Sequence, residues 1–213
     1  MNATTPWTGA TILALAIAGC QQPSKTAAKP ATQQAAPAKT TAPKPTVAQK
    51  PAASSASSAA GLRWDVPTEW KTQAPRAMRV ATYTLPRAEG DSEDGECAVY
   101  YFGPGQGGSV DANIKRWIGQ MRSSEGGPAD QFAKRKDSEV AGISVSQVDI
   151  EGTFLYSPSP MSPQKTPKEN YRMIAVIATG SQGPVFFKMT APSKTATAHL
   201  ERVEKLIASL KKI

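Results

Sequence analysis

Three closely spaced glycines raise the question of a nucleotide site. Gly103, Gly105 and Gly108 spell G-x-G-x-x-G between an apolar stretch typical of a strand and an expected helix. A dinucleotide site needs such a turn inside a β-α-β unit, with an acid at the end of the second strand. The following segment, 122–139, has no buried-strand pattern, and its Asp130 lies in an expected loop. We therefore interpret the glycines as a turn between strand and helix, and we predict no cofactor.

Other residues that carry catalytic or metal chemistry are few. Cys97 would need a nearby base to act as a nucleophile, and the single histidine, His199, lies far along the chain. We expect Cys97 to be a small buried apolar residue and His199 to lie on a helix surface or an edge. Asp149 and Glu151 share one face of an expected strand, where two carboxylates can bind a cation, but no third ligand is close in sequence. We predict no metal site, and a binding role is favoured over an enzymatic one.

Polar residues on an expected helix are better candidates for binding. Arg116 and Gln120 are four residues apart and so share one helix face. Arg116 either pairs with a carboxylate of the fold or offers its guanidinium to an acidic ligand. Arg79, on an expected strand, joins this polar patch. Lys188, the one charged residue in the apolar stretch "VFFKMT", is interpreted as an outward-facing strand lysine.

Hydrophobic periodicity predicts the strands that must position these residues. They occupy residues 78–86 and 97–103, two stretches within 138–156 on either side of Gly142, and residues 171–179 and 184–192. The first two are joined by an acidic turn and the last two by "GSQG", so each pair is predicted to form an antiparallel hairpin. A short extended segment around "LRWDVPTEW" precedes them.

Two stretches change to the helical period. The first has Ser109 or Asp111 as its N-cap, and Trp117 on its apolar face is expected in the core. The second runs from residue 195 to the end of the chain, where Lys211 and Lys212 suit the negative end of a helix. The resulting order, β-β-α-β-β-β-β-α, predicts an α+β fold with a mainly antiparallel β-sheet flanked by helices.

The amino terminus has the pattern of a bacterial export signal. Residues 10–19 are apolar and uncharged, but a bilayer core takes about 20 such residues, so they fit a secretory signal instead. They end in Ile-Ala-Gly before Cys20, which resembles the lipobox, where cleavage precedes a cysteine that becomes lipidated. Residues 1–9 depart from the pattern because they lack Lys and Arg. We predict a lipoprotein signal peptide over 1–19 and lipidation of Cys20.

Residues 20–60 are predicted to be a disordered tether behind the lipidated cysteine. Ala, Pro, Lys, Thr, Gln and Ser make up nearly all of this segment, so it cannot bury enough apolar area to fold. Its five lysines and lack of acids supply +5 of the formal charge of +8, which leaves residues 61–213 nearly balanced as a single domain. A charged tether of this kind favours anionic headgroups or cell-wall polymer, and no nucleic acid, as its contact.

A resemblance appears at the helix "NIKRWIGQM", the strand "MRVATY", the lead "WDVPTEW" and the late strand "FFKMTAP". Together they resemble a group of uncharacterised bacterial exported lipoproteins, whose Asn-x-x-Arg-Trp-x-x-Gln pattern is carried by Asn113, Arg116, Trp117 and Gln120. In architecture the group is similar to PsbP, the extrinsic subunit of the oxygen-evolving complex, and to the Ran-release factor of that fold. The resemblance implies a PsbP-like α/β/α sandwich with binding or assembly roles and no catalysis. These four residues and Arg79 form the candidate binding patch.

Two function classes remain open at this stage. The favoured class is a membrane-anchored envelope lipoprotein with a non-catalytic domain that binds an envelope protein or a cell-wall polymer. The alternative is an envelope hydrolase that acts on cell-wall or lipid material, and it requires a cleft with a carboxylate pair or a nucleophile beside a base. Gln21, directly after Cys20, favours the outer membrane over the inner membrane.

Overall fold

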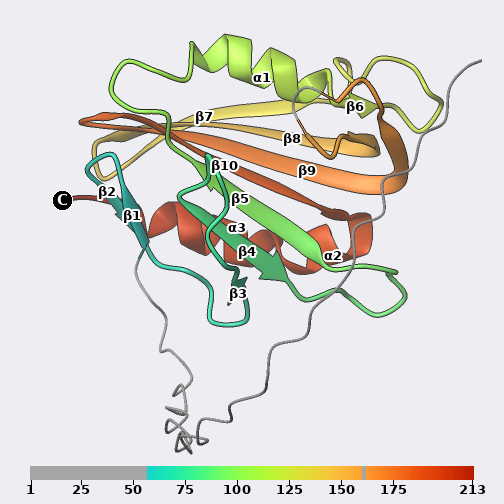
Figure 1. The fold of residues 1–213 in the computed structure, drawn as a ribbon, viewed down its shortest axis with the longest axis horizontal. Coiled ribbons are helices and arrows are strands. Elements are labelled where there is room, and N and C mark those ends of the chain that lie inside the picture. The colour runs from blue at the N-terminus through green and yellow to red at the C-terminus, as the bar shows by residue number, and fades with distance from the viewer. Residues whose placement is uncertain (1–56, 160–161) are drawn as a thin grey trace, which may run out of the picture. The chain divides into compact units, whose positions relative to one another are not determined.

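The computed structural model describes residues 57–159 and 162–213. The predicted signal peptide, Cys20 and the tether up to residue 56 lie outside the described residues. The described chain forms an eight-stranded antiparallel sheet in the order β3-β4-β5-β10-β9-β8-β6, and β7 also pairs with β8 (Figure 1). The strands are β3 (Lys71–Thr72), β4 (Ala81–Leu85), β5 (Gly95–Tyr100), β6 (Met121–Arg122), β7 (Lys134–Val140), β8 (Ile143–Tyr156), β9 (Thr166–Gly180) and β10 (Gly183–Pro192).

Helices cover both faces of this sheet. Helix α1 (Val110–Ile118) lies on one face, and α2 (Ser193–Ala198) and α3 (Leu200–Ala208) lie on the other, as Figure 1 shows. The predicted α+β fold, a mainly antiparallel sheet between helices, is therefore confirmed. Both predicted hairpins, β4-β5 and β9-β10, are present, and so are the two strands around Gly142, β7 and β8.

Each face of the sheet has its own hydrophobic core, because alternate residues of a strand point to opposite faces. On the α3 side, Phe187 and Met189 of β10 pack with Leu206. On the α1 side, Phe186 of β10 packs with Trp117, whose ring meets it edge-on at 6.3 Å between centroids. Burying a side chain of this size contributes about 1.5–3 kcal/mol, so these alternating residues fix the register of the sheet.

A second, three-stranded sheet corrects two predictions. It contains β1 (Ser57–Ala59), β2 (Leu62–Trp64) and β11 (Lys211–Lys212). Residues 57–59, assigned to the predicted tether, therefore belong to the folded domain, because β1 pairs with β2 and Tyr83 donates a hydrogen bond to the Ser57 hydroxyl at 2.8 Å. The two lysines predicted at a helix end are in a strand, because α3 ends at Ala208 and the chain then pairs with β2.

The predicted carboxy-terminal helix is divided in two at His199. This residue is 6% exposed, not at the surface or at an edge as predicted. Its Nδ1 accepts a hydrogen bond from Trp70 Nε1 at 3.0 Å, and its Nε2 donates to the carbonyl oxygen of Pro86 at 3.0 Å. These contacts hold the ring between the lead segment and the end of β4, and the backbone departs from helical geometry there.

The glycine-rich segment links β5 to α1, as predicted. Ser109 is the N-cap of α1, and its hydroxyl accepts a hydrogen bond from the Ala112 amide. The closest packing in this segment occurs at Gly107, which occupies one of the variable positions of the G-x-G-x-x-G pattern. Gly107 has φ of +95°, and a Cβ there would lie 2.7 Å from the Phe186 ring. Only glycine satisfies both conditions without a shift, so this segment is a close-packed turn against the sheet.

Among the described residues, none of the helices combines the length and the apolar character needed to cross a membrane.

Candidate functional site

Helix α1 covers only part of its face of the sheet. Its main neighbours are β6, β8 and β9, so the strands β4, β5 and β10 carry side chains on this face beyond the helix. Two of them are charged, namely Glu96 of β5 and Lys188 of β10. Lys188 points to this side because its neighbours Phe187 and Met189 belong to the core on the opposite side. The polar half of the face lies directly beside the predicted binding patch.

Lys188 is the central cation of this face. Its ammonium donates a hydrogen bond to Gln120 Oε1 and lies 5.0 Å from the centroid of the Phe154 ring. The outward-facing position predicted for Lys188 is therefore wrong, because its ammonium contacts Gln120, which lies two residues after the end of α1. Burial lowers the pKa of Lys188 from 10.5 to about 8; nearby Glu96 opposes this change, and Arg79 and Arg116 add to it.

Arg79 approaches the same face from the segment before β4. Its guanidinium forms an ion pair with Glu96 at 2.9 Å and donates to the Thr82 hydroxyl at 3.3 Å. It also lies over the Tyr100 ring, 5.6 Å from the centroid. Burial raises the pKa of Tyr100, so its hydroxyl stays protonated beside this guanidinium. Arg76 shares Glu96, at 3.3 Å, so one carboxylate serves two guanidinium groups.

The remaining predicted residues have separate roles. Asn113 is buried, and its amide nitrogen donates to the carbonyl oxygens of Gly107 at 2.7 Å and Ser109 at 2.8 Å. Its oxygen accepts a hydrogen bond from Arg116, which is exposed. Trp117 is buried in the core, as predicted. Asn113 and Trp117 thus position α1. Arg116 is exposed, and Gln120 contacts Lys188.

We call this region the cationic face and define it by six residues. They are Arg79, Glu96, Tyr100, Arg116, Lys188 and Gln120. The structure thus places three of the predicted patch residues together and adds three that the sequence analysis did not connect. The register explains the added residues, because Glu96, Ala98 and Tyr100 point to one side of β5 while Cys97 and Val99 point to the other core.

Exposed apolar side chains border the cationic face. Met78 is 70% exposed and Val80 46% exposed, and both flank Arg79 in the chain. Phe102 stacks on Tyr100 with 6.1 Å between the ring centroids. Cations and exposed apolar side chains therefore lie next to one another in this part of the molecule.

The residues considered for catalysis are held in structural roles. Cys97 is buried, and burial raises the pKa of its thiol to about 12, so the thiolate that a nucleophile needs is disfavoured. Both ring nitrogens of His199 are occupied by Trp70 and Pro86. The structure therefore does not bring the two together as a nucleophile and a base.

Asp149 and Glu151 share a face, as predicted, but an arginine lies with them. Arg172 donates to the two oxygens of Asp149 at 2.8 and 2.6 Å and forms an ion pair with Glu151 at 3.0 Å. These bonds raise the pKa of Arg172, which stays charged. Within the described residues, no group of three or more side chains of the metal-ligating types gathers at one place.

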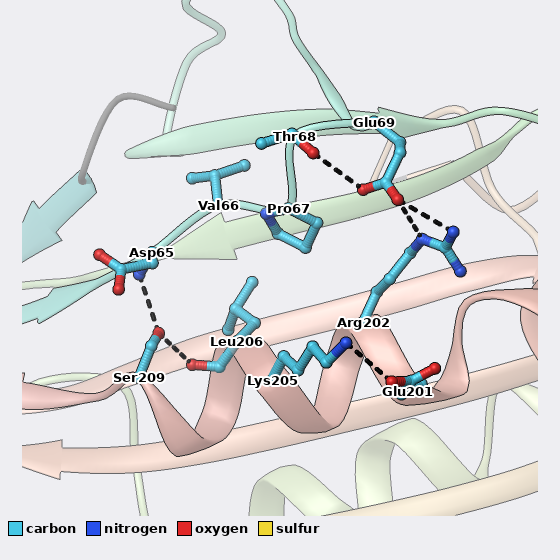
Figure 2. A pocket seen from close by; sticks show the side chains of 10 residues that line it. All are labelled: Asp65, Val66, Pro67, Thr68, Glu69, Glu201, Arg202, Lys205, Leu206 and Ser209. Atoms are coloured by element: carbon cyan, nitrogen blue, oxygen red, sulfur yellow. Dashed lines mark hydrogen bonds and ion pairs between the residues drawn. The ribbon is translucent and has the colours of Figure 1, made fainter. Parts of the chain in front are cut away.

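A pocket of about 400 Å³ lies between the lead segment and α3. Figure 2 shows the side chains that line it. Its charged side chains largely bind one another. Glu69 forms an ion pair with Arg202 at 2.9 Å, and Glu201 forms one with Lys205 at 2.7 Å. Its floor contains Leu206, which belongs to the core. The groups that would contact a ligand are thus already paired, and this pocket is a weaker candidate than the cationic face.

Comparisons with known proteins bear on the fold alone. No protein-family model matches the chain, and no curated protein matches it. A solved structure that is similar is the solution structure of cyanobacterial PsbP (CyanoP) from Synechocystis sp. PCC 6803. The match covers 72% of this chain and 87% of that chain, with 8% sequence identity and a TM-score of 0.43. The PsbP-like architecture implied by the resemblance and membership of a lipoprotein group both stay predictions.

Proposed function

We propose that this protein is a membrane-anchored lipoprotein of the cell envelope whose domain binds an acidic protein partner through the cationic face. The role is binding or assembly, without catalysis. Lys188 is the observation that carries the proposal, because its ammonium is partly buried with Gln120 as its hydrogen-bond partner and has no ion pair among the described residues. An incoming carboxylate would neutralise a charge that the fold holds at the surface of its sheet.

The charges around Lys188 support an acidic partner. Arg116 also forms no ion pair within the part of the chain that the structure describes, and Glu96 is divided between Arg76 and Arg79. Positive groups therefore outnumber the carboxylate on this face. A guanidinium offers a planar pair of donors that matches a carboxylate, so Arg116 is suited to contact an acidic side chain directly.

The apolar border supports a protein in place of a small anion. A protein interface has a desolvated core in which aromatic and aliphatic side chains are buried, with polar contacts around it. Met78, Val80 and Phe102 supply such side chains next to the cations. A free phosphate or acetate would leave them in water, whereas a protein surface covers them.

The anchor rests on the amino-terminal sequence. Residues 1–19 have the pattern of a secretory signal, and Cys20 follows them in a lipobox-like context. A lipid on Cys20 holds the domain at a membrane, and Gln21 favours the outer membrane. Residues 21–56 then give the domain reach toward a partner or a cell-wall polymer.

The alternative, an envelope hydrolase, has less support. Its carboxylate pair, Asp149 and Glu151, shares Arg172, and Cys97 is buried with a raised pKa. Neither arrangement supplies a free acid and base, or an ionised nucleophile, in the manner that hydrolysis needs. We therefore retain the binding role.

The experiment places a photoreactive amino acid in the full chain in its native envelope. One probe replaces Val80 at the border of the cationic face, and the control replaces Glu204, which is exposed on α3 across the sheet. Irradiation at Val80 is expected to yield one discrete adduct with an acidic protein, identified by mass spectrometry. The same adduct in equal yield from Glu204, or none from Val80, would contradict the proposal.

A further inference from the structure

A second cavity lies at a break in strand pairing, away from the cationic face. The strands β6 and β7 pair with the same edge of β8, but β7 reaches only to Asp149 and β6 begins at Thr153. Residues 150–152 have no strand partner on that edge within the described chain. A cavity of about 570 Å³ opens there, bordered by the segment 123–134 and the first half of β9. Small-molecule sites typically measure roughly 300–1,000 Å³.

The backbone around this cavity, which we call the bulge pocket, is shaped in two unusual places. The pairing of β8 with β9 shifts between Gly152 and Phe154, which is a β-bulge. A Cβ at Gly152 would lie 2.1 Å from the Arg122 carbonyl oxygen, so only glycine allows this approach. On the facing strand, Asn170 has φ of +54°, a left-handed conformation that costs about 1 kcal/mol or more in a residue other than glycine.

Several polar side chains of the bulge pocket have no partner among residues 57–159 and 162–213. Gln131, Thr153, Glu169 and Asn170 line it, and none of them makes a side-chain hydrogen bond or ion pair in the described part of the chain. An amide offers both donors and an acceptor, a hydroxyl offers one donor and two lone pairs, and a carboxylate accepts. This mixed set matches a ligand with many hydroxyl groups, each of which donates and accepts.

An exposed aromatic ring stands among these groups. Phe132 lines the bulge pocket and is 54% exposed, so most of its ring contacts no other part of the described protein. The polar groups of a pyranose ring lie around its rim, and its C–H bonds form a flat apolar face. Such a ligand satisfies the amides and hydroxyls with its rim and covers an aromatic ring with its face, which a purely polar or a purely apolar ligand does not do.

The charge of the bulge pocket selects against acidic ligands. Three carboxylates surround it, on Asp149, Glu151 and Glu169, while Lys134 and the adjacent Arg172 supply two cations. The local sum is therefore −1. Arg172 occupies both oxygens of Asp149 and forms an ion pair with Oε1 of Glu151. The second oxygen of Glu151, whose side chain is 62% exposed, and the carboxylate of Glu169 can accept hydrogen bonds from hydroxyl groups.

From these contacts we propose that the bulge pocket binds an uncharged oligosaccharide. One sugar ring stacks on Phe132, and its hydroxyl groups exchange hydrogen bonds with Gln131, Glu169 and Asn170. The inference is independent of the proposed function, because the bulge pocket shares no residue with the cationic face. A domain that carries both sites joins an acidic protein to a neutral polysaccharide chain.

The test titrates the full chain with tri-N-acetylchitotriose and with maltotriose by isothermal titration calorimetry. At least one of them is expected to bind with Kd near or below about 1 mM, and trigalacturonate is expected not to bind, because its carboxylates meet Glu151 and Glu169. Phe132→Ala is expected to weaken binding by about tenfold or more. Phe102→Ala removes an exposed aromatic side chain at the border of the cationic face instead and is expected to leave saccharide binding unchanged.

Asn170→Gly gives a sharper comparison. It removes the amide and relieves the left-handed strain, so it is expected to raise Tm and to weaken saccharide binding together. The matched control is Ala141→Gly, at φ of +49° in the turn between β7 and β8, which is expected to raise Tm and leave binding unchanged. Failure of both trisaccharides to bind, binding that survives both Phe132→Ala and Asn170→Gly, or binding of trilysine in place of the saccharides would each overturn the proposal. Loss of the Val80 adduct would leave this result unaffected.

Discussion

At the scale of single residues, Lys188 shows how an otherwise apolar strand can place a single charge on one face of the sheet. The residue lies between Phe187 and Met189, both of which belong to the core on the other side of the sheet. Its ammonium therefore enters the α1 side, beside Phe154 and Gln120. Burial there disfavours the charged form, and Arg79 and Arg116 disfavour it further. Lys188, Arg79 and Arg116 repel one another on this face, and the acidic partner proposed above would offset that repulsion.

Lys188→Met is expected to stabilise the protein near pH 7 by on the order of 1–3 kcal/mol, because it removes a buried charge. The pKa of Lys188 is lowered from 10.5 to about 8 in the folded state. Below pH 8 Lys188 is charged in the folded protein, where burial opposes the charge. Between pH 8 and pH 10.5 the unfolded chain binds more protons than the folded protein, so the stability of the wild-type protein rises with pH.

The advantage of Lys188→Met should therefore shrink as pH rises from about 8 and vanish above about 10.5, where Lys188 is neutral in both states. Urea denaturation of both proteins across this range measures it. Lys115→Met, at an exposed position of α1, is the control and should show no such trend. A Lys188→Met variant that is less stable at every pH would show that Lys188 supports the fold.

Single residues also show why sequence predicted only part of the candidate site. Arg116 and Gln120 were found from their spacing on one helix face, which requires no tertiary information. Glu96, Tyr100 and Lys188 belong to two strands that pair across the sheet, and their proximity depends on the register of β5 with β10. Nothing local in the sequence specifies that register. Asn113 was assigned to the binding patch from the Asn-x-x-Arg-Trp-x-x-Gln resemblance, and its hydrogen bonds to the glycine segment cannot be seen in the sequence.

At the scale of elements, the glycine segment determines where α1 begins and how closely the chain approaches Phe186. Periodicity predicted the two hairpins and α1, because long alternating or helical patterns carry that information locally. It did not predict the short strands β1, β3, β6 and β11, because two or three residues are too few to show an alternation. Two of them, β6 and β11, also depend on pairing with the distant strands β8 and β2. The division between α2 and α3 was missed for the same reason, since it depends on contacts of His199 with Trp70 and Pro86.

A pair of substitutions in the glycine segment tests this account. Gly105→Ala, at φ of +68° with open space around it, is expected to destabilise by about 1 kcal/mol from backbone strain alone. Gly107→Ala carries the same strain and also overlaps the buried Phe186 ring, so it is expected to destabilise by roughly 1–3 kcal/mol more. Chemical denaturation measures both, and equal effects would show that Gly107 is not packed against Phe186 as described.

At the scale of the whole molecule, the proposal joins a lipid anchor, a tether and a binding domain. In this proposal the anchor would place the domain at a membrane, and the tether would let it search for a partner within reach. The domain contributes the cationic face and, by the further inference, the bulge pocket. Composition and the lipobox-like segment predict the first two parts without tertiary structure, whereas the two binding surfaces depend on the fold.

Removal of the lipid acceptor tests the anchor. Cys20→Ser is expected to leave the protein as an uncleaved precursor or as a soluble exported form, because the lipid is the proposed attachment. Fractionation after a high-salt wash, which removes charge-mediated contacts of the tether, measures the result. If the variant remains in the membrane fraction after the wash, the anchor is not a lipid on Cys20.

The measurement that tests the central claim most directly is the effect of charge reversal on the Val80 photoadduct in the native envelope. Arg116→Glu places a carboxylate beside Lys188 and is expected to reduce the adduct yield by about tenfold or more, as repulsion of an acidic partner requires. Lys115→Glu makes the same charge change one residue earlier on α1 and is expected to leave most of the yield intact. Equal loss from both variants, or no loss from Arg116→Glu, would contradict an acidic partner bound at the cationic face.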